Sequence, residues 1–391
     1  MSLSNILTRD FVFAFFALSA YSSGYFVLIP TLPIYLSKLK AGESEIGVLI
    51  GVFSVSSLAF RPFVGKALQR IPERTFMLAG CVLSVLSSAA LFLARPFWPF
   101  FLVRVLQGIS LAFVFTASTA LIANISQERQ RGRSLGYFLL SNNVAFALAP
   151  PFGMFLIDRF GFTPLFLFCT AVSLASLFLT APLKKRDPIL SNDPRIDFQT
   201  VSSAGEGGLF SRQALPSCIM ALFTHMIWGA ITAFFPLYAI AQGVTNSGFF
   251  FTIFAITLIL CRTMGGKWLD RYSREKILFP CFINYTAAAL LLAFSKTVPM
   301  FALVAVIWGA GTAFAYPTLV ALALDLCGPN RGLAMGTFTA FTDLGVGLGA
   351  VLMGLVLSAT DYRTMFLSLC LLGLVNLLYL NTFARRRIVS Q

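Results

Sequence analysis

Long apolar stretches alternate with short polar loops along the whole chain, and this pattern predicts helices that cross a membrane. A helix needs about 20 apolar residues to cross about 30 Å of hydrocarbon, and it satisfies its backbone groups within one segment. We therefore predict an all-α integral membrane protein with twelve transmembrane helices. The predicted spans are approximately 11–36, 46–68, 75–94, 98–124, 134–157, 163–182, 213–241, 247–269, 276–295, 299–325, 332–358 and 363–383.

Several short motifs occur twice, about 200 positions apart, which indicates an internal duplication. The matching segments are 61–70 with 262–271, 108–113 with 309–314, and 131–136 with 331–336. A period this long is not that of a solenoid, whereas two matching hydrophobic halves are typical of transporters with a central site. The longest polar stretch lies between the halves. We predict two pseudo-symmetric six-helix bundles, residues 1–183 and 213–391, joined by a cytoplasmic linker at 184–212.

Composition supports a lipid environment. Hydrophobic residues make up 58% of the chain and charged residues 11%, against about a quarter charged in soluble domains. The net charge of +14 comes from basic residues in loops, so we expect the lipid bilayer as the partner and no nucleic acid. These loops lie mostly on the side of the termini, and the positive-inside rule then places both termini in the cytoplasm. In a bacterium this multi-pass protein would lie in the inner (cell) membrane.

Enzymatic and metal chemistry have no support in the sequence. Seven cysteines are scattered through the apolar runs without the spacing of a zinc site or a disulfide framework, and there is a single histidine. No nucleophile–base set or phosphate-binding loop is present. We therefore predict that the protein is not an enzyme and has neither a metal nor a cofactor.

Two loops and three spans carry family motifs. The loop after the eighth span, with Gly266, Asp270 and Arg271, resembles the signature of the major facilitator superfamily, which reads roughly G-x-L-x-D-R-x-G-R-R. The loop after the second span is similar but has Gln69 in place of the family's aspartate. Further segments resemble the fourth-helix motif R-x-x-Q-G and motifs of the sugar and drug efflux branch. They are Gly65-Lys-Ala-Leu-Gln69-Arg70, Arg104-Val-Leu-Gln107-Gly108, Pro150-Pro-Phe-Gly153 and Asp343-Leu-Gly345.

The resemblance implies a central cavity lined by the first, fourth, seventh and tenth spans. Taken together, aromatic and polar residues at helical spacing on these spans suggest a mixed cavity that suits amphipathic molecules or organic anions, whereas ordinary packing between helices is the alternative for each of them taken singly. These candidates are Tyr21, Tyr25, His225, Trp228, Trp308, Thr312 and Tyr316. The resemblance also implies that the loop with Asp270 acts at an inner gate, and Gln69 would make the equivalent contact without charge.

Charged groups inside a membrane are expensive, about 2.5–3.5 kcal/mol each on insertion scales, so the few present are candidates for function. Arg104, with Gln107 one turn on, could bind an anionic group or shift the pKa of an acid. Asp343 and His225 could exchange protons. Each has an alternative structural role as a hydrogen-bonded packing residue. Asn142, Asn143, Pro150 and Gly153 make the fifth span a candidate for bending, although the two asparagines could simply bond neighbouring helices.

These observations predict a secondary transporter that works by alternating access. We expect proton-coupled export of a small organic molecule, amphipathic or anionic, by a monomer. An importer or an uncoupled facilitator is the alternative within transport, because the first span has no internal carboxylate. A membrane sensor or scaffold that transports nothing is the alternative outside transport.

Overall fold

The computed structural model describes residues 7–68, 70–93, 97–126, 131–184, 211–244, 247–327 and 331–389, without the side chains of 131–133, 266–270, 331–333 and 384–389. Within these ranges the chain forms α-helices and no strands. The helices are α1 (Arg9–Phe26), α2 (Leu28–Lys38), α3 (Glu43–Ala67), α4 (Glu73–Ala90), α5 (Trp98–Ile125), α6 (Arg131–Phe160), α7 (Phe162–Thr180), α8 (Leu215–Ala241), α9 (Gly248–Arg271), α10 (Arg274–Phe294), α11 (Val298–Cys327), α12 (Arg331–Ala359) and α13 (Tyr362–Val389).

Length and hydropathy confirm the all-α membrane class. In the described chain, 11 segments are long and apolar enough to cross a membrane. The first of them combines α1 and α2 into one span, Arg9–Lys38, as the sequence predicts. Helix α4 coincides with the predicted span at 75–94 and is not among the eleven; it opens with Glu73 and Arg74 in its first turn. The twelve predicted spans therefore all correspond to helices.

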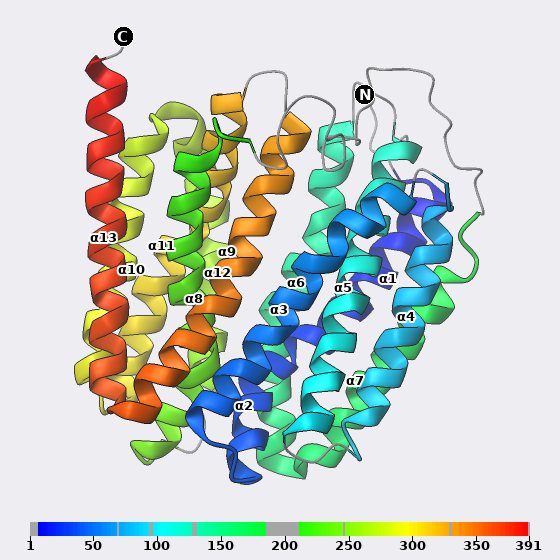
Figure 1. Cartoon of the computed structure of the whole chain (residues 1–391), viewed down its shortest axis with the longest axis horizontal. Coiled ribbons are helices and arrows are strands. Elements are labelled where there is room, and N and C mark those ends of the chain that lie inside the picture. The colour runs from blue at the N-terminus through cyan, green and yellow to red at the C-terminus, as the bar shows by residue number, and fades with distance from the viewer. Residues whose placement is uncertain are drawn as a thin grey trace. The chain divides into compact units, whose positions relative to one another are not determined.

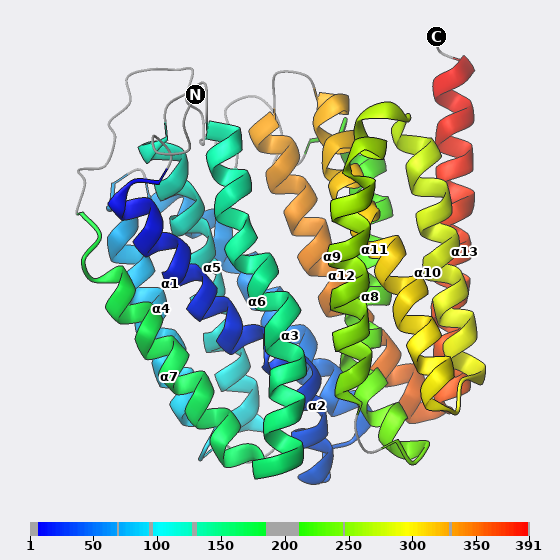
Figure 2. The ribbon, with the colours of Figure 1, turned by 180° about the vertical axis from the view of Figure 1, so that it is seen from behind.

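The chain divides into two compact units. Unit 1 contains residues Met1–Tyr35 and Val52–Ser203, and unit 2 contains Leu36–Gly51 and Ala204–Gln391. Figures 1 and 2 show α8 to α13 of unit 2 as a bundle of long helices that lie side by side. The segment Leu36–Gly51 precedes most of unit 1 along the chain but packs with unit 2. The predicted linker lies largely outside the described residues and stays a prediction.

Aromatic packing repeats between the two units. In each unit one tyrosine contacts three aromatic rings that occupy matching places in the two halves of the sequence. Ring centroids lie 5.8, 4.8 and 5.0 Å apart for Tyr35 with Phe100, Phe162 and Phe166, and 5.7, 5.2 and 5.0 Å apart for Tyr238 with Phe301, Tyr362 and Phe366. The duplication read from the motifs therefore extends to the packing inside each unit.

Glycines bring the backbones of α8 and α12 into contact. A Cβ atom at Gly345 would lie 2.6 Å from the carbonyl oxygen of Leu222, and one at Gly349 would overlap the carbonyl oxygen of Met226. Such small residues let membrane helices approach closely, which is how helices pack where lipid is as apolar as the protein. This crossing fixes the rotation of α12 relative to α8, and with it the direction of every polar side chain on α12.

We expect Gly349→Ala to lower the apparent melting temperature of the detergent-solubilised protein. The added methyl group must displace backbone of α8, and such overpacking costs about 1–3 kcal/mol. Gly136→Ala is the matched control, because a Cβ atom there meets nothing within 4 Å. That change gains up to about 1 kcal/mol of helix propensity, so it should leave stability equal or higher. Equal melting temperatures for both variants would contradict the close contact.

Candidate functional site

Arg104 owes its position to a close contact between α5 and α3. A Cβ atom at Gly108 would overlap both the hydroxyl oxygen of Ser56 and the carbonyl oxygen of Phe53. Glycine at this position therefore allows the two backbones to touch. Arg104 lies one helical turn before Gly108 on α5, so its side chain begins beside the Phe53 ring. The fourth-helix motif thus combines a cation with the glycine that places it.

The Arg104 guanidinium is buried, with 5% of the residue exposed. Its Nη1 atom donates a hydrogen bond to Oε1 of Gln107 at 2.9 Å, and its Cζ atom lies 4.5 Å from the centre of the Phe53 ring. Tyr25 stacks on Phe53, with centroids 4.6 Å apart. A desolvated cation–π contact contributes about 2 kcal/mol. These contacts hold the guanidinium in place.

The second copy of this crossing is apolar. A Cβ atom at Gly309 would lie 3.1 Å from both the carbonyl oxygen of Phe254 and the Cβ atom of Thr257, so the same contact forms between α11 and α9. Ala305 occupies the place of Arg104, and Trp308 occupies that of Gln107. Trp308 is fully buried, and its ring lies 4.4 Å from that of Phe254. This predicted cavity residue therefore lies in an aromatic core.

Two other predicted cavity residues bond within their own units. The Tyr21 hydroxyl lies 3.1 Å from Oγ of Ser110, which itself donates to the carbonyl oxygen of Gly80 at 2.7 Å, so Tyr21 is the donor. Thr312 donates to the carbonyl oxygen of Trp308 at 2.8 Å and lies 3.0 Å from the hydroxyl of Tyr285. Both Tyr21 and Thr312 are buried. Their hydroxyls join neighbouring helices of each unit.

His225 and Tyr316 meet in unit 2. Nδ1 of His225 lies 2.8 Å from the carbonyl oxygen of Ala221, an acceptor, so we assign the neutral tautomer with its proton on Nδ1. The other ring nitrogen, Nε2, is then a base. The rings of His225 and Tyr316 meet edge to face at 5.8 Å, and Tyr316 is 39% exposed. Trp228, one turn from His225, is half-buried on the same helix.

Asp343 lies in the middle of α12 and is half-buried. The nearby hydroxyls of Thr339 and Thr342 both donate to carbonyl groups of their own helix, at 3.0 Å and 2.8 Å. Gly345, two positions further on, faces α8. Positions two apart on a helix point to nearly opposite sides, so Asp343 faces away from α8. Asp343 therefore points away from the face of α12 that packs against His225 of α8.

The fifth-span candidates lie on α6 and divide into two kinds. Ser22 of α1 donates to Oδ1 of Asn142 at 2.8 Å, whereas Asn143 is exposed. A Cβ atom at Gly153 would lie 2.5 Å from the side chain of Val27, the residue between α1 and α2. Helix α6 is continuous through Pro150 and Pro151. Gly153 therefore serves close packing of α6 against the α1–α2 junction.

The gate motif is described only in part. Gln69, the surroundings of Gly266 and the side chain of Asp270 lie outside what the structure describes. The side chains of Arg70 and Arg271 are exposed, and Gly65 is half-buried, with open space where a Cβ atom would lie. The predicted role of this loop as a gate stays a prediction.

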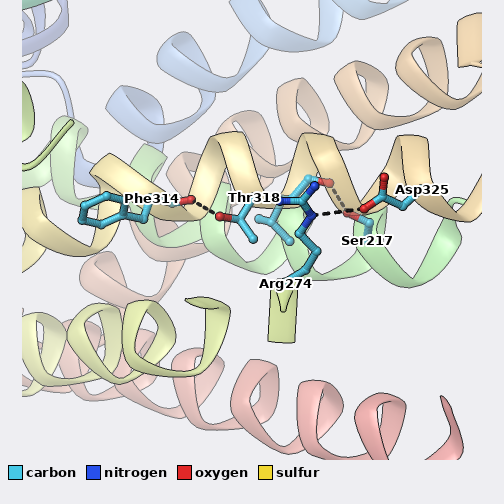
Figure 3. A network of polar contacts seen from close by, with 6 residues as sticks. Ser217, Arg274, Phe314, Thr318 and Asp325 are labelled. Atoms are coloured by element: carbon cyan, nitrogen blue, oxygen red, sulfur yellow. Dashed lines mark hydrogen bonds and ion pairs between the residues drawn. The ribbon is translucent and has the colours of Figure 1, made fainter. Parts of the chain in front are cut away.

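Polar contacts directly after the gate loops join matching helices in the two units. In unit 2, Nε of Arg274 at the start of α10 lies 3.1 Å from Oδ2 of Asp325 near the end of α11, and Figure 3 shows the two side chains pointing toward one another. In unit 1, Asn124 of α5 donates to Oε1 of Glu73 at the start of α4. Positions 73 and 274, like 124 and 325, are 201 apart. We call these contacts the unit 1 brace and the unit 2 brace.

Sequence reasoning missed both braces, although the repeat offset contains the signal for them. Glu73 and Arg274 carry opposite charges at equivalent positions, so alignment of the halves makes them look unrelated. Each brace pairs one donor with one acceptor. The donor of the unit 1 brace, Asn124, lies on α5, whereas the donor of the unit 2 brace, Arg274, lies on α10, which is equivalent to α4. Glu73 is 9% exposed, whereas the Arg274 and Asp325 side chains are 30% and 47% exposed. The unit 1 brace is therefore the more desolvated.

The chain is similar to known transporters in sequence and in fold. The family model described as Major Facilitator Superfamily matches residues 14–250 and 219–389. The staphylopine export protein of Staphylococcus aureus (strain Mu50 / ATCC 700699) is 23% identical over 86% of each chain. The quinolone resistance protein NorA of Staphylococcus aureus (strain COL) is 23% identical over 85% of each chain. The crystal structure of the human organic anion transporter MFSD10 (TETRAN) aligns with a TM-score of 0.68 at 18% identity, covering 95% of this chain and 99% of that one.

We expect Asn124→Ala to destabilise the protein more than Asp325→Ala. Loss of Asn124 leaves the buried Glu73 carboxylate without its amide donor, and an unsatisfied buried group costs about 1–3 kcal/mol. The exposed ion pair of unit 2 contributes about 0–1 kcal/mol and weakens as salt rises. Thermal unfolding in detergent at low and high sodium chloride measures both effects. A larger loss from Asp325→Ala at either salt concentration would overturn this ranking.

Proposed function

Because the chain belongs to the Major Facilitator Superfamily and is a transporter, we propose that it exports a small organic anion or amphipathic molecule in exchange for protons. The names of two relatives, a staphylopine export protein and a quinolone resistance protein, support export as the direction. The chain covers most of both relatives, so the comparison concerns the whole transporter. The residues of the two units support the substrate class and the coupling.

The buried Arg104 carries the proposal for the substrate. Its contacts with Gln107 and Phe53 orient the guanidinium. The equivalent place in unit 2 is filled by alanine with an aromatic core around it, so the helix crossing itself does not require a cation. A guanidinium is suited to carboxylate and phosphate groups, and the stacked rings of Phe53 and Tyr25 suit an apolar body. We therefore assign this region to an organic anion.

Proton coupling is assigned to unit 2, where Asp343 and His225 lie within the span region of α12 and α8. A half-buried carboxyl group and an imidazole with a basic Nε2 can each gain and lose a proton. Protonation of either group removes or adds one charge inside the membrane, where charge is expensive. The proton thus provides the change in charge that a coupled transporter needs between its states.

The mechanism that we propose is alternating access by the two bundles of a monomer, with both termini in the cytoplasm. The positive-inside rule supports this orientation, because loops on the side of the termini contain most of the basic residues. A ligand shifts a conformational equilibrium only through different affinities for the two states. Substrate at Arg104 and a proton at Asp343 or His225 would each favour one state.

Substitution Arg104→Gln should lower the rate of uptake into inside-out vesicles at least tenfold for organic anions. A tenfold loss corresponds to about 1.4 kcal/mol of lost stabilisation. The probe is a panel of fluorescent carboxylates and sulfonates, and the vesicle interior is made more acidic than the bath, so that protons leave as substrate enters. Arg363→Gln is the control, because Arg363 is exposed at the start of α13, where it contacts the Phe294 ring. Full activity of Arg104→Gln toward every transported probe would exclude this site.

Asp343→Asn should abolish transport driven by a pH difference while exchange of labelled for unlabelled substrate continues. The amide keeps the shape of the side chain but cannot bind and release a proton. His225→Gln is assayed in parallel, and the variant that retains exchange but ignores the pH difference identifies the coupling residue. A wild-type protein that ignores the pH difference is an uncoupled facilitator. A purified protein that moves no probe in either mode contradicts the proposed transport.

A further inference from the structure

Helix α11 continues through a proline, which deprives one of its carbonyl groups of the usual donor. In an α-helix each N–H group donates to the carbonyl oxygen four residues earlier. Pro317 has no N–H group, so the carbonyl oxygen of Ala313 receives no hydrogen bond from it, and the proline ring pushes against that carbonyl group. In the hydrocarbon of a membrane such a group needs a donor from another part of the protein, because water is absent.

Arg262 of α9 supplies a donor to this carbonyl group. Its Nε atom donates a hydrogen bond to the carbonyl oxygen of Ala313 at 3.3 Å, and both residues lie within segments long and apolar enough to cross a membrane. Arg262 is half-buried and Ala313 is fully buried. The bond therefore joins α9 to the turn of α11 that Pro317 leaves open.

Two hydroxyl groups support the same turn of α11. Thr318 donates to the carbonyl oxygen of Phe314 at 2.7 Å, and Figure 3 shows this bond. The Tyr285 hydroxyl of α10 lies 3.0 Å from Oγ1 of Thr312, and Thr312 itself donates to a carbonyl group of its own helix, so Tyr285 is the donor. Residues 312, 313 and 314 thus each accept a hydrogen bond from a side chain.

The other half of the chain is an internal control for this arrangement. Thr116 lies 201 positions before Pro317, so the equivalent turn of α5 keeps its N–H group. Neither Thr312 nor Thr318 has a hydroxyl counterpart there, because the residues 201 positions earlier are a leucine and an alanine. The hydroxyl supports therefore occur in the half that has the proline.

The arginine, by contrast, is present in both halves. Arg61 matches Arg262, and its Cζ atom lies 5.8 Å from the centre of the Phe115 ring. Phe115 matches Tyr316, the residue immediately before Pro317. The arginine is thus a shared feature, and the proline turn is what unit 2 adds. A cation with several N–H groups already lies where the proline frees a carbonyl group.

The supported turn contains Tyr316, whose ring meets the imidazole of His225 edge to face at 5.8 Å. The same ring contacts that of Phe338 on α12, also at 5.8 Å. Tyr316 lies three residues after Ala313, and its backbone is restricted because a proline follows it. A shift of the turn at Ala313 would therefore move the Tyr316 ring relative to His225.

We propose that Arg262 is a positioning residue, which binds the carbonyl group freed by Pro317 and so fixes Tyr316 against His225. This inference rests on the proposed function in one respect, because His225 is one of the two candidates for proton exchange. The hydrogen bond itself does not depend on that role. Arg262 acts here as a donor through Nε, so the bond needs an N–H group at that position and not a positive charge.

The first test separates the donor of Arg262 from its charge. Glutamine places its Nε2 atom the same number of bonds from the backbone as Nε of arginine, whereas methionine places a methyl group there and has no donor. We expect Arg262→Gln to keep the apparent melting temperature of the wild type in detergent and Arg262→Met to lower it by at least about 2 °C. Equal melting temperatures for the two variants would overturn the proposal.

The second test restores the missing N–H group. Alanine at position 317 donates to Ala313 from within α11, so Arg262→Met should cost less than about half as much in a Pro317→Ala protein as in the wild type. Arg61→Met is the matched control, and its effect should be the same with and without Thr116→Ala, because threonine and alanine both have the N–H group. A loss from Arg262→Met that ignores position 317 would contradict the bond.

The third test follows the surroundings of His225 by nuclear magnetic resonance. His225 is the single histidine of the chain, so protein purified without a histidine tag and labelled at histidine reports this imidazole alone. Tyr316→Leu shows where its signals lie without the phenol ring. Arg262→Met should move the signals toward that position, whereas Arg262→Gln and Arg61→Met should leave them in place. Signals that Arg262→Met does not move would overturn the positioning role.

These measurements need neither substrate nor transport, so the inference and the proposed function fail separately. If transport by His225→Gln still responds to a pH difference, His225 is removed from the proposed coupling and the bond of Arg262 stands. An Arg262→Met protein that matches the wild type in all three tests removes the inference, and the proposed function stands.

Discussion

Membrane helices gain little from burying apolar surface against one another, because lipid tails are as apolar as leucine. Close approach of backbones is the contact that remains, and in this chain glycines determine where it happens. Gly108 places α5 on α3, Gly349 places α12 on α8, and Gly47 places the first part of α3 on α12. Each crossing fixes the rotation of its helices. The directions of Arg104 and Asp343 follow from these contacts more than from any property of the charged residues.

The duplicated crossing separates what the fold needs from what function adds. Both copies keep the glycine and the aromatic residue beneath it, Gly108 with Phe53 and Gly309 with Phe254. One copy adds a buried guanidinium, while the other adds a tryptophan. A buried cation is expensive in a membrane, and an alternative without one exists in the same chain. The crossing itself therefore does not require Arg104, and the binding of an anion that we propose would account for it.

The sequence predicts elements better than side-chain environments, for a physical reason. A span is a local property of about 20 residues, so apolar stretches locate the helices, α4 included. The environment of a side chain depends on the rotation of its helix and on partners that are distant along the chain. Trp308 has the spacing of a cavity residue but is buried against Phe254. Glu73 accepts a hydrogen bond from Asn124, which lies 51 positions away along the chain. The grouping of Leu36–Gly51 with unit 2 depends on glycine contacts with α12, which no local pattern contains.

Apart from Arg61 and Arg262, which occupy matching places, the two units hold different candidate binding groups within their spans. Unit 1 has a cation at Arg104, and unit 2 has a carboxyl group at Asp343 together with the single histidine. In the exchange that we propose, an anionic substrate would neutralise Arg104, and a proton would neutralise Asp343. Each ligand would then remove one charge from within a unit. Since charge inside a membrane is tolerated best when neutralised or hydrated, each ligand in this proposal would shift the balance between open and closed states. Exchange requires that substrate and proton favour these states differently, and separate residues in separate units permit that.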